Sequence, residues 1–243
     1  MKKMVCFAVV IAYCWAFGAC GMNQNMPLEK IAKRLEGNWI NQEYLNVLRL
    51  TQSPQQADEA TITKVVQIKV DTFQQLILSF QEGDDWLLDR DMNGVYFSSV
   101  FNHKLKLNAK LLSNQKLQLG NKVFLRFKEE TDVKNKDIVL VQQILFTGAY
   151  DWNGKLVEFL KDGRIKGMEK VGLTTYYPVV HYSSNKEVDQ VWLNKGRDNS
   201  VKYGFEFKKK KLYFYQLECP DQEVFCGEKK QRGKVLFELN KRR

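Results

Sequence analysis

Turn dipeptides divide this sequence into short segments rich in β-branched and aromatic residues. Asn93-Gly94 and Asn153-Gly154 are strong hairpin signals, because a type I′ turn needs two residues that accept a positive φ. Asp162-Gly163 is a third signal of this kind. Segments separated by such turns pair with their neighbours along the chain. The sequence therefore predicts an all-β fold built as an antiparallel meander.

The expected strands form two series, separated by the charged stretch 128–132. Each series contains about eight strands, a number that closes a small barrel. The segment 44–60, which contains Ser53-Pro54, is interpreted as either helix or loop. The first series is expected near 37–43, 61–70, 73–81, 85–91, 95–101, 104–112, 115–119 and 122–128. The second is expected near 138–150, 155–161, 164–170, 174–182, 187–194, 200–207, 211–218 and 234–240.

A short amphipathic helix is expected before the first series. Pro27 suits the first turn of a helix, and Leu28, Ile31 and Leu35 share one side. Gly37 ends the pattern. The apolar side of this helix should therefore pack against the β-structure that follows.

A faint internal repeat indicates two tandem domains. Gly37-Asn38-Trp39 has a counterpart in Gly148-Ala149-Tyr150, and the segment 122–127 matches 234–239 at a similar offset. We therefore expect two β-domains, with a single larger barrel or sandwich as the alternative. The expected domain ranges are 27–132 and 133–243.

A short helix, a Gly-x-Trp motif, a meander and a closing Lys-Val-aromatic-Leu strand resemble the lipocalin-like lipoproteins common in Bacteroidetes. Gly37 and Trp39 match the start of the lipocalin signature, where the Trp packs across the closed end of the barrel. Arg126 or Arg243 would supply the Arg that stacks on this Trp. The second half matches more loosely, with Tyr150 in place of Trp. The resemblance implies lipocalin-like β-barrels.

The N-terminal segment has the form of a secretory signal. A basic segment, 1–4, precedes an apolar run, 5–17, that is too short for a membrane-spanning helix of about 20 residues. No later apolar segment approaches that length. We therefore expect an exported protein from which residues 1–19 are removed.

The end of this signal, Phe17-Gly18-Ala19-Cys20, resembles a lipobox with Phe where Leu is usual. The bulky Phe17 also disfavours the ordinary signal peptidase, which prefers a small residue there. We expect lipidation of Cys20 and a tether over 20–26. Because Gly21 is not the Asp that retains many lipoproteins in the inner membrane, the sorting rule implies the outer membrane. The alternative is that Cys20 is incidental in a signal cut elsewhere.

Charge and cysteines agree with an envelope location. Removing the signal lowers the formal net charge from +10 to +8, because the signal contains Lys2 and Lys3 and no acidic residue. A basic exported protein meets anionic envelope lipid, so this lipid is a candidate partner and nucleic acid is not. In an oxidising compartment Cys219 and Cys226 are expected to form a disulfide, worth about 2–3 kcal/mol.

Aromatic residues of the second series are the candidate ligand-binding residues. Tyr203, Phe205 and Phe207 share one face of an alternating strand, and Trp192 lies in the strand before it. The alternation is also consistent with a packed core, which is the interpretation that it favours. If the barrel is hollow, these four side chains would line a site for a small apolar or amphipathic ligand.

Two charged patterns have ordinary explanations beside functional ones. The loop 89–94 opens like a calcium site, but the closing acid would fall at Val100, and a hairpin accounts for the same residues. The run 208–211 fits a solvated hairpin tip, or part of a basic surface for anionic lipid. The other members of that surface would be Lys229, Lys230, Arg232, Lys241, Arg242 and Arg243.

No enzyme constellation is visible in the sequence. It contains no Gly-x-Ser-x-Gly, His-Glu-x-x-His or phosphate-loop motif, and its histidines are the isolated His103 and His181. The acids of 82–91 could contain a glycosidase pair, but acids beside turns are ordinary. We expect a protein that is not an enzyme, with no catalytic residue, metal or cofactor.

These observations favour a lipid-anchored cell-envelope protein that holds a small apolar or amphipathic ligand in a β-barrel. The rival hypothesis is a structural or adaptor lipoprotein that binds another envelope component through its outer surface.

The first prediction concerns Cys20. In cells, Cys20→Ser should abolish labelling of the full chain by a fatty-acid analogue, because the thiol is the acceptor of the lipid. Cys219→Ser is the matched control and should label normally. Unchanged labelling of Cys20→Ser would reject the assignment.

Overall fold

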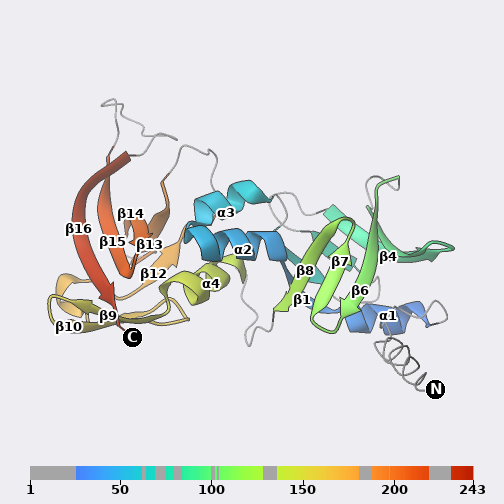
Figure 1. Cartoon of the computed structure of the whole chain (residues 1–243), viewed down its shortest axis with the longest axis horizontal. Coiled ribbons are helices and arrows are strands. Elements are labelled where there is room, and N and C mark those ends of the chain that lie inside the picture. The colour runs from blue at the N-terminus through green and yellow to red at the C-terminus, as the bar shows by residue number, and fades with distance from the viewer. Residues whose placement is uncertain are drawn as a thin grey trace, which may run out of the picture.

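The fold is described by a computed structural model, which covers residues 26–61, 64–68, 75–78, 84–99, 102, 104–127, 136–180, 188–196, 198–218 and 231–242. Figure 1 shows two β-sheets at opposite ends of an elongated molecule, with helices between them. Both sheets are antiparallel, and the predicted all-β fold is confirmed. Cys20, Cys219 and Cys226 lie outside the described residues, so lipidation and the disulfide stay predictions.

The first sheet is a closed barrel of eight strands in sequential order, in which β8 pairs back with β1. Its buried interior includes Phe97, Leu111 and Leu117. The strands are β1 (Gly37–Asn41), β2 (Val65–Ile68), β3 (Gln75–Leu78), β4 (Asp84–Asp91), β5 (Gly94–Ser99), β6 (Lys106–Ser113), β7 (Lys116–Leu119) and β8 (Lys122–Phe127). Helix α1 (Leu28–Leu35) buries Ile31 and Leu35 in the same core, as the amphipathic pattern predicts.

Trp39 closes the α1 end of this barrel. Its side chain is fully buried, and its Nε1 donates a hydrogen bond of 2.7 Å to the Leu35 carbonyl at the end of α1. Arg126, its register partner on β8, lies with Cζ 4.1 Å from the indole centroid and donates to the Arg34 carbonyl at 2.7 Å. Arg126 is thus the cation that stacks on Trp39. A Cβ on Gly37, whose φ is +129°, would lie 3.0 Å from this guanidinium.

The second sheet also contains eight strands, in the order β11-β10-β9-β16-β15-β14-β13-β12. Its edges meet at the bridge between Arg164 and Thr175, supported by a 2.7 Å hydrogen bond from the Ile165 amide to the Thr174 carbonyl. This short seam nearly completes a second barrel. The strands are β9 (Gly148–Trp152), β10 (Lys155–Phe159), β11 (Ile165–Lys166), β12 (Tyr176–Pro178), β13 (Gln190–Leu193), β14 (Val201–Lys208), β15 (Lys211–Glu218) and β16 (Gln231–Lys241), with a 3-10 turn η2 (Glu169–Val171) before β12.

Tyr150 occupies in the second sheet the place that Trp39 has in the first. Its hydroxyl donates to the Phe146 carbonyl at 2.8 Å, its register partner is Lys241, and the Lys241 Nζ lies 5.8 Å from the ring centroid. Trp39 and Tyr150 therefore each donate a hydrogen bond to the carbonyl four residues earlier. The sequence repeat aligned Arg126 with Glu238, three residues short of Lys241, the residue that pairs with Tyr150.

Helices occupy the space between the sheets. The segment 44–60 is helical, as α2 (Gln42–Thr51) and α3 (Pro54–Ala60). Asn41 caps α2 by accepting from the Glu43 amide at 2.9 Å, and Ser53 caps α3 by accepting from the Gln56 amide at 3.1 Å. These caps, together with the burial of Tyr44, Leu45 and Leu48, explain why a stretch with Ser-Pro inside it forms two helices rather than a loop.

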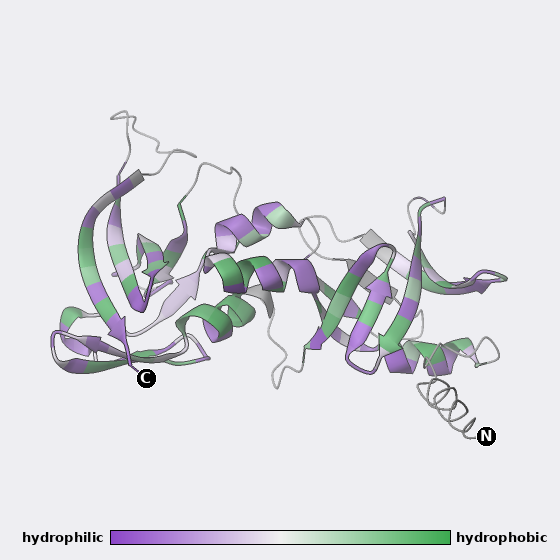
Figure 2. Cartoon of the chain, viewed as in Figure 1, coloured by the Kyte–Doolittle hydropathy of each residue, from purple (hydrophilic) through white to green (hydrophobic). Residues whose placement is uncertain are grey.

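The predicted strand 138–150 was partly wrong. This segment forms α4 (Lys136–Val141) and the π-helix η1 (Gln142–Phe146) before β9 begins. Ile138, Val141 and Leu145 are buried at helical spacing, so a run of β-branched residues that suits a strand is stabilised here as a helix by packing. Figure 2 shows α4 as a largely hydrophobic helix beside the second sheet.

The core of the second barrel extends across α2 to the outer side of the first barrel. Tyr44 and Leu48 of α2 belong to the same buried cluster as Phe146, and Phe127 of β8 packs against it. Lys64, only 2% exposed, forms an ion pair with Asp58 and donates a 2.6 Å hydrogen bond to the Val180 carbonyl in the second half. The α3 amide of Gln55 donates to Asp189 at 2.9 Å. Within the described ranges, no helix is both long and apolar enough to cross a membrane.

The second prediction tests the closed end of the first barrel. Arg126→Ala removes the ring contact and charged hydrogen bonds to backbone carbonyls, and should lower the free energy of unfolding by about 2 kcal/mol. Arg126→Lys should fall between wild type and Ala, because it keeps the charge without the planar fork. Urea unfolding followed by tryptophan fluorescence measures both, and an unchanged midpoint for Arg126→Ala would contradict the stacking role.

Candidate functional site

The interior of the second barrel is filled around Phe205. This side chain is 1% exposed, and its ring centroid lies 4.9 Å from that of Phe146 and 5.9 Å from that of Phe207. Phe146 also lies 5.2 Å from Tyr176 and 5.3 Å from Phe207. Sequence reasoning missed Phe146 because its segment was interpreted as a strand. At this level the predicted pocket residues Phe205 and Phe207 are part of an aromatic core.

The other two predicted pocket residues lie elsewhere. Tyr203 is half-buried two residues from Phe205, with its ring centroid 6.4 Å from that of Phe237, which lies 5.8 Å from Trp152. Trp192 pairs in register with Lys202, whose Nζ lies 4.8 Å from the indole centroid. Because strand residues alternate, Trp192 and Lys202 lie on the face opposite Tyr203. The structure therefore does not bring Trp192 together with the other three.

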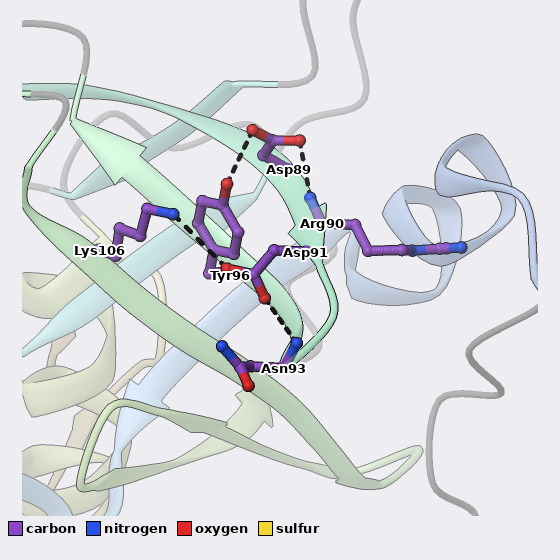
Figure 3. A network of polar contacts seen from close by, with 6 residues as sticks. All are labelled: Asp89, Arg90, Asp91, Asn93, Tyr96 and Lys106. Atoms are coloured by element: carbon purple, nitrogen blue, oxygen red, sulfur yellow. Dashed lines mark hydrogen bonds and ion pairs between the residues drawn. The ribbon is translucent and has the colours of Figure 1, made fainter.

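The calcium-like loop is a hairpin held by side chains (Figure 3). Asp91 accepts a 2.8 Å hydrogen bond from the Asn93 amide and lies 3.5 Å from the Lys106 Nζ. Asp89 accepts from the Tyr96 hydroxyl at 3.0 Å. A hydrogen bond with Tyr96 and the charge of Asp91 raise the pKa of Lys106. Both carboxylates thus have partners, and the described part of the chain contains no cluster of three acidic, His or Cys side chains that could hold a metal.

A groove of about 940 Å³ lies on the outer face of β14, β15 and β16. Phe205 and Phe214 lie in the core, so they define the inner face of these strands. Because strand side chains alternate between faces, their neighbours along each strand point outward. Six basic side chains and one acidic side chain line the groove. The lining residues are Glu206, Lys208, Lys209, Lys210, Lys211, Tyr213, Tyr215, Arg232, Gly233, Val235, Asn240 and Lys241.

The hairpin tip 208–211 forms the basic end of the groove. Lys208 pairs in register with Lys211. The Lys241 amide donates a hydrogen bond to the Lys210 carbonyl, which places the C-terminal end of β16 beside the tip. Lys211 is paired with Glu238, and this hydrogen bond raises the pKa of Lys211. The side chains 208–210 make no ion pair within the described residues. Their charges therefore dominate the potential at this end.

Tyr215 forms the floor at the other end. It points to the outer face but is 2% exposed, because its ring lies flat against Gly204, where a Cβ would be 2.0 Å from Tyr215 Cε2. The hydroxyl donates to the Phe205 carbonyl at 3.2 Å, and burial raises the pKa of Tyr215 to about 12. Arg232 lies with Cζ 5.6 Å from the ring centroid, and its Nη1 lies 3.0 Å from the Glu206 Oε2. Only glycine at 204 allows this flat floor.

The predicted basic surface is only partly gathered here. Lys208 to Lys211, Arg232 and Lys241 line the groove, whereas Arg242 pairs with Asp151 at 3.0 Å. Lys229, Lys230 and Arg243 lie outside the described residues. Sequence reasoning missed Tyr213 and Tyr215 as lining, although their alternation with Leu212 and Phe214 gave a signal that they share the outward face.

Comparisons of the chain with protein-family models, with curated proteins and with solved structures found no match. Assignment of function therefore rests on the geometry of the chain itself.

The third prediction concerns Phe205. Phe205→Ala should lower the free energy of unfolding by about 3–5 kcal/mol, because it leaves a cavity among packed rings. Trp192→Ala, on the opposite face, should cost clearly less. Denaturant unfolding measures both. A near-neutral Phe205→Ala variant that alters saturable binding of an apolar fluorescent probe would instead restore the hollow-barrel hypothesis.

Proposed function

We propose that this is a lipid-anchored cell-envelope protein that binds an anionic envelope component in the outer groove of β14, β15 and β16. The observation that carries the proposal is the lining of that groove, in which six basic side chains accompany one acidic side chain. The signal-like N-terminus and Cys20 support the location in the envelope. The packed surroundings of Phe205 favour an outer site over an interior one.

The size and the charge of the groove suit a small anionic ligand. Its volume of about 940 Å³ lies within the range of small-molecule pockets, roughly 300–1,000 Å³. Clustered lysines raise the local concentration of anions, and this attraction extends about 8 Å at physiological salt. The groove is therefore suited to a ligand with phosphate or carboxylate groups.

A small apolar ligand inside the second barrel is the second candidate. Tyr203, Phe237 and Trp152 are half-buried aromatics in edge-to-face contact at the margin of the cluster that contains Phe205. Their exposed edges favour an apolar molecule at that end of the barrel. The sequence hypothesis of an interior ligand is retained in this restricted form.

The fourth prediction tests anion binding by the groove. The chain 21–243, which contains every described element, should bind a short polyphosphate with an affinity that falls as salt is raised. Lys208→Gln with Lys210→Gln should weaken binding about tenfold, which corresponds to about 1.4 kcal/mol. The matched control, Lys104→Gln with Lys110→Gln in the first barrel, removes the same charge far from the groove and should change little. Equal losses in both double variants, or no binding by the wild type, would refute the proposal.

A further inference from the structure

We propose that the groove holds a single amphiphile, with its anionic group at the lysine tip and its apolar part against Tyr213 and Val235, and presents it away from the anchored end of the protein. This inference rests on the proposed function of the groove. It adds the class of ligand and its direction in the site.

The register of the strands sets a polarity along the groove. At the tip, Lys208 pairs with Lys211. Four residues further along β15, Tyr215 lies between Gly204 of β14 and Val235 of β16. At about 3.3 Å per residue, the two levels are separated by about 13 Å. One end of the groove is therefore cationic, and the other end is aromatic and aliphatic.

Glu206 divides these two ends. It is the acidic member of the lining, and Arg232 binds it at 3.0 Å from above Tyr215. This ion pair neutralises Arg232, the cation nearest to Tyr215. The aromatic end of the groove therefore attracts an anion only weakly. The lysines 208–210 make no such pair within the described ranges. An anionic headgroup is consequently stabilised at the tip, which leaves the apolar part of the same molecule to lie along Tyr213 and Val235.

The shape of the groove favours one molecule over a bilayer. Tyr215 forms the floor beneath Arg232 and is 2% exposed, whereas Val235 is 51% exposed at the rim. A bilayer surface contacts residues that protrude, whereas a groove of about 940 Å³ is large enough to admit a small ligand beside Tyr213 and Val235.

The groove lies far from the anchored end of the molecule. Figure 1 shows α1 at one end of the long axis and β14, β15 and β16 at the other. Met26 is hydrogen-bonded through its carbonyl to Arg90 of the first barrel. From Cys20 to Met26 the chain reaches at most about 20 Å. A lipid on Cys20 would therefore place the first barrel next to the membrane, and the packing of α2 against both barrels holds the groove at the distal end.

The test compares a monomeric anionic lipid with a membrane of the same charge. Dihexanoylphosphatidic acid, kept below its micelle concentration, should bind the chain 21–243 with one-to-one stoichiometry in calorimetry. Its affinity should exceed that of inorganic phosphate and of dihexanoylphosphatidylcholine by at least about tenfold. Vesicles of long-chain phosphatidic acid and phosphatidylcholine should sediment little of the protein.

Two variants separate the ends of the groove. Lys208→Gln with Lys210→Gln should weaken the anionic lipid about tenfold. Val235→Asp should weaken the same lipid while leaving binding of inorganic polyphosphate within about twofold, because it disturbs only the apolar end. Leu112→Asp, at a 39% exposed position of the first barrel, is the matched control and should change neither ligand.

Every other outcome contradicts either the amphiphile site or the anion site. Binding to vesicles without binding to the monomeric lipid would replace the amphiphile site by a membrane-docking surface. Binding of polyphosphate with no gain from acyl chains, or no effect of Val235→Asp, would leave the proposed anion site and reject the amphiphile. Failure of every anionic ligand would reject both.

Discussion

Burial of α2 between the two sheets is the interaction on which the rest of the molecule depends. Tyr44 and Leu48 lie in one apolar cluster with the aromatic residues of the second barrel, while Phe127 brings the outer face of the first barrel against it. The buried Lys64 is acceptable there only because Asp58 and a carbonyl satisfy its charge and its donors. The barrels therefore support each other, and the groove has a fixed place relative to the N-terminal end.

The same arrangement of an aromatic residue and a cation closes one end of each barrel, and the contact is closer in the first barrel. Trp39 with Arg126 and Tyr150 with Lys241 each join the first strand of a barrel to its last, and each aromatic bonds to the helix before it. The guanidinium stacks more closely than the ammonium group. The second sheet also closes only through the bridge at Arg164. The stronger closure belongs to the N-terminal barrel, and the weaker one to the barrel that carries the groove.

Local signals predicted the strands well, because a hairpin is determined by residues close in sequence. Asn153 and Gly154 take the positive φ values that a type I′ turn needs, whereas Asn93-Gly94 misplaces its turn by one residue, since Gly94 already pairs with Asp91. The helix at 138–146 was missed because only packing distinguishes it from a strand. The groove could not be predicted as a unit, since the register of three strands and the bulges of β16 bring Lys208, Tyr215 and Arg232 together.

The contacts between the two halves have a consequence for how the chain reaches its native state. The contacts that hold α3 and Lys64 against the second half span 134 and 116 residues. Such long separations slow folding, because the intervening chain must be ordered before the contact forms. In a chain that is synthesised from its N-terminus, α2 can pack on β1 and β8 of the first barrel early, but the part of its apolar side that faces Phe146 stays uncovered until the second sheet has been made. An apolar surface left uncovered over that interval is prone to aggregation.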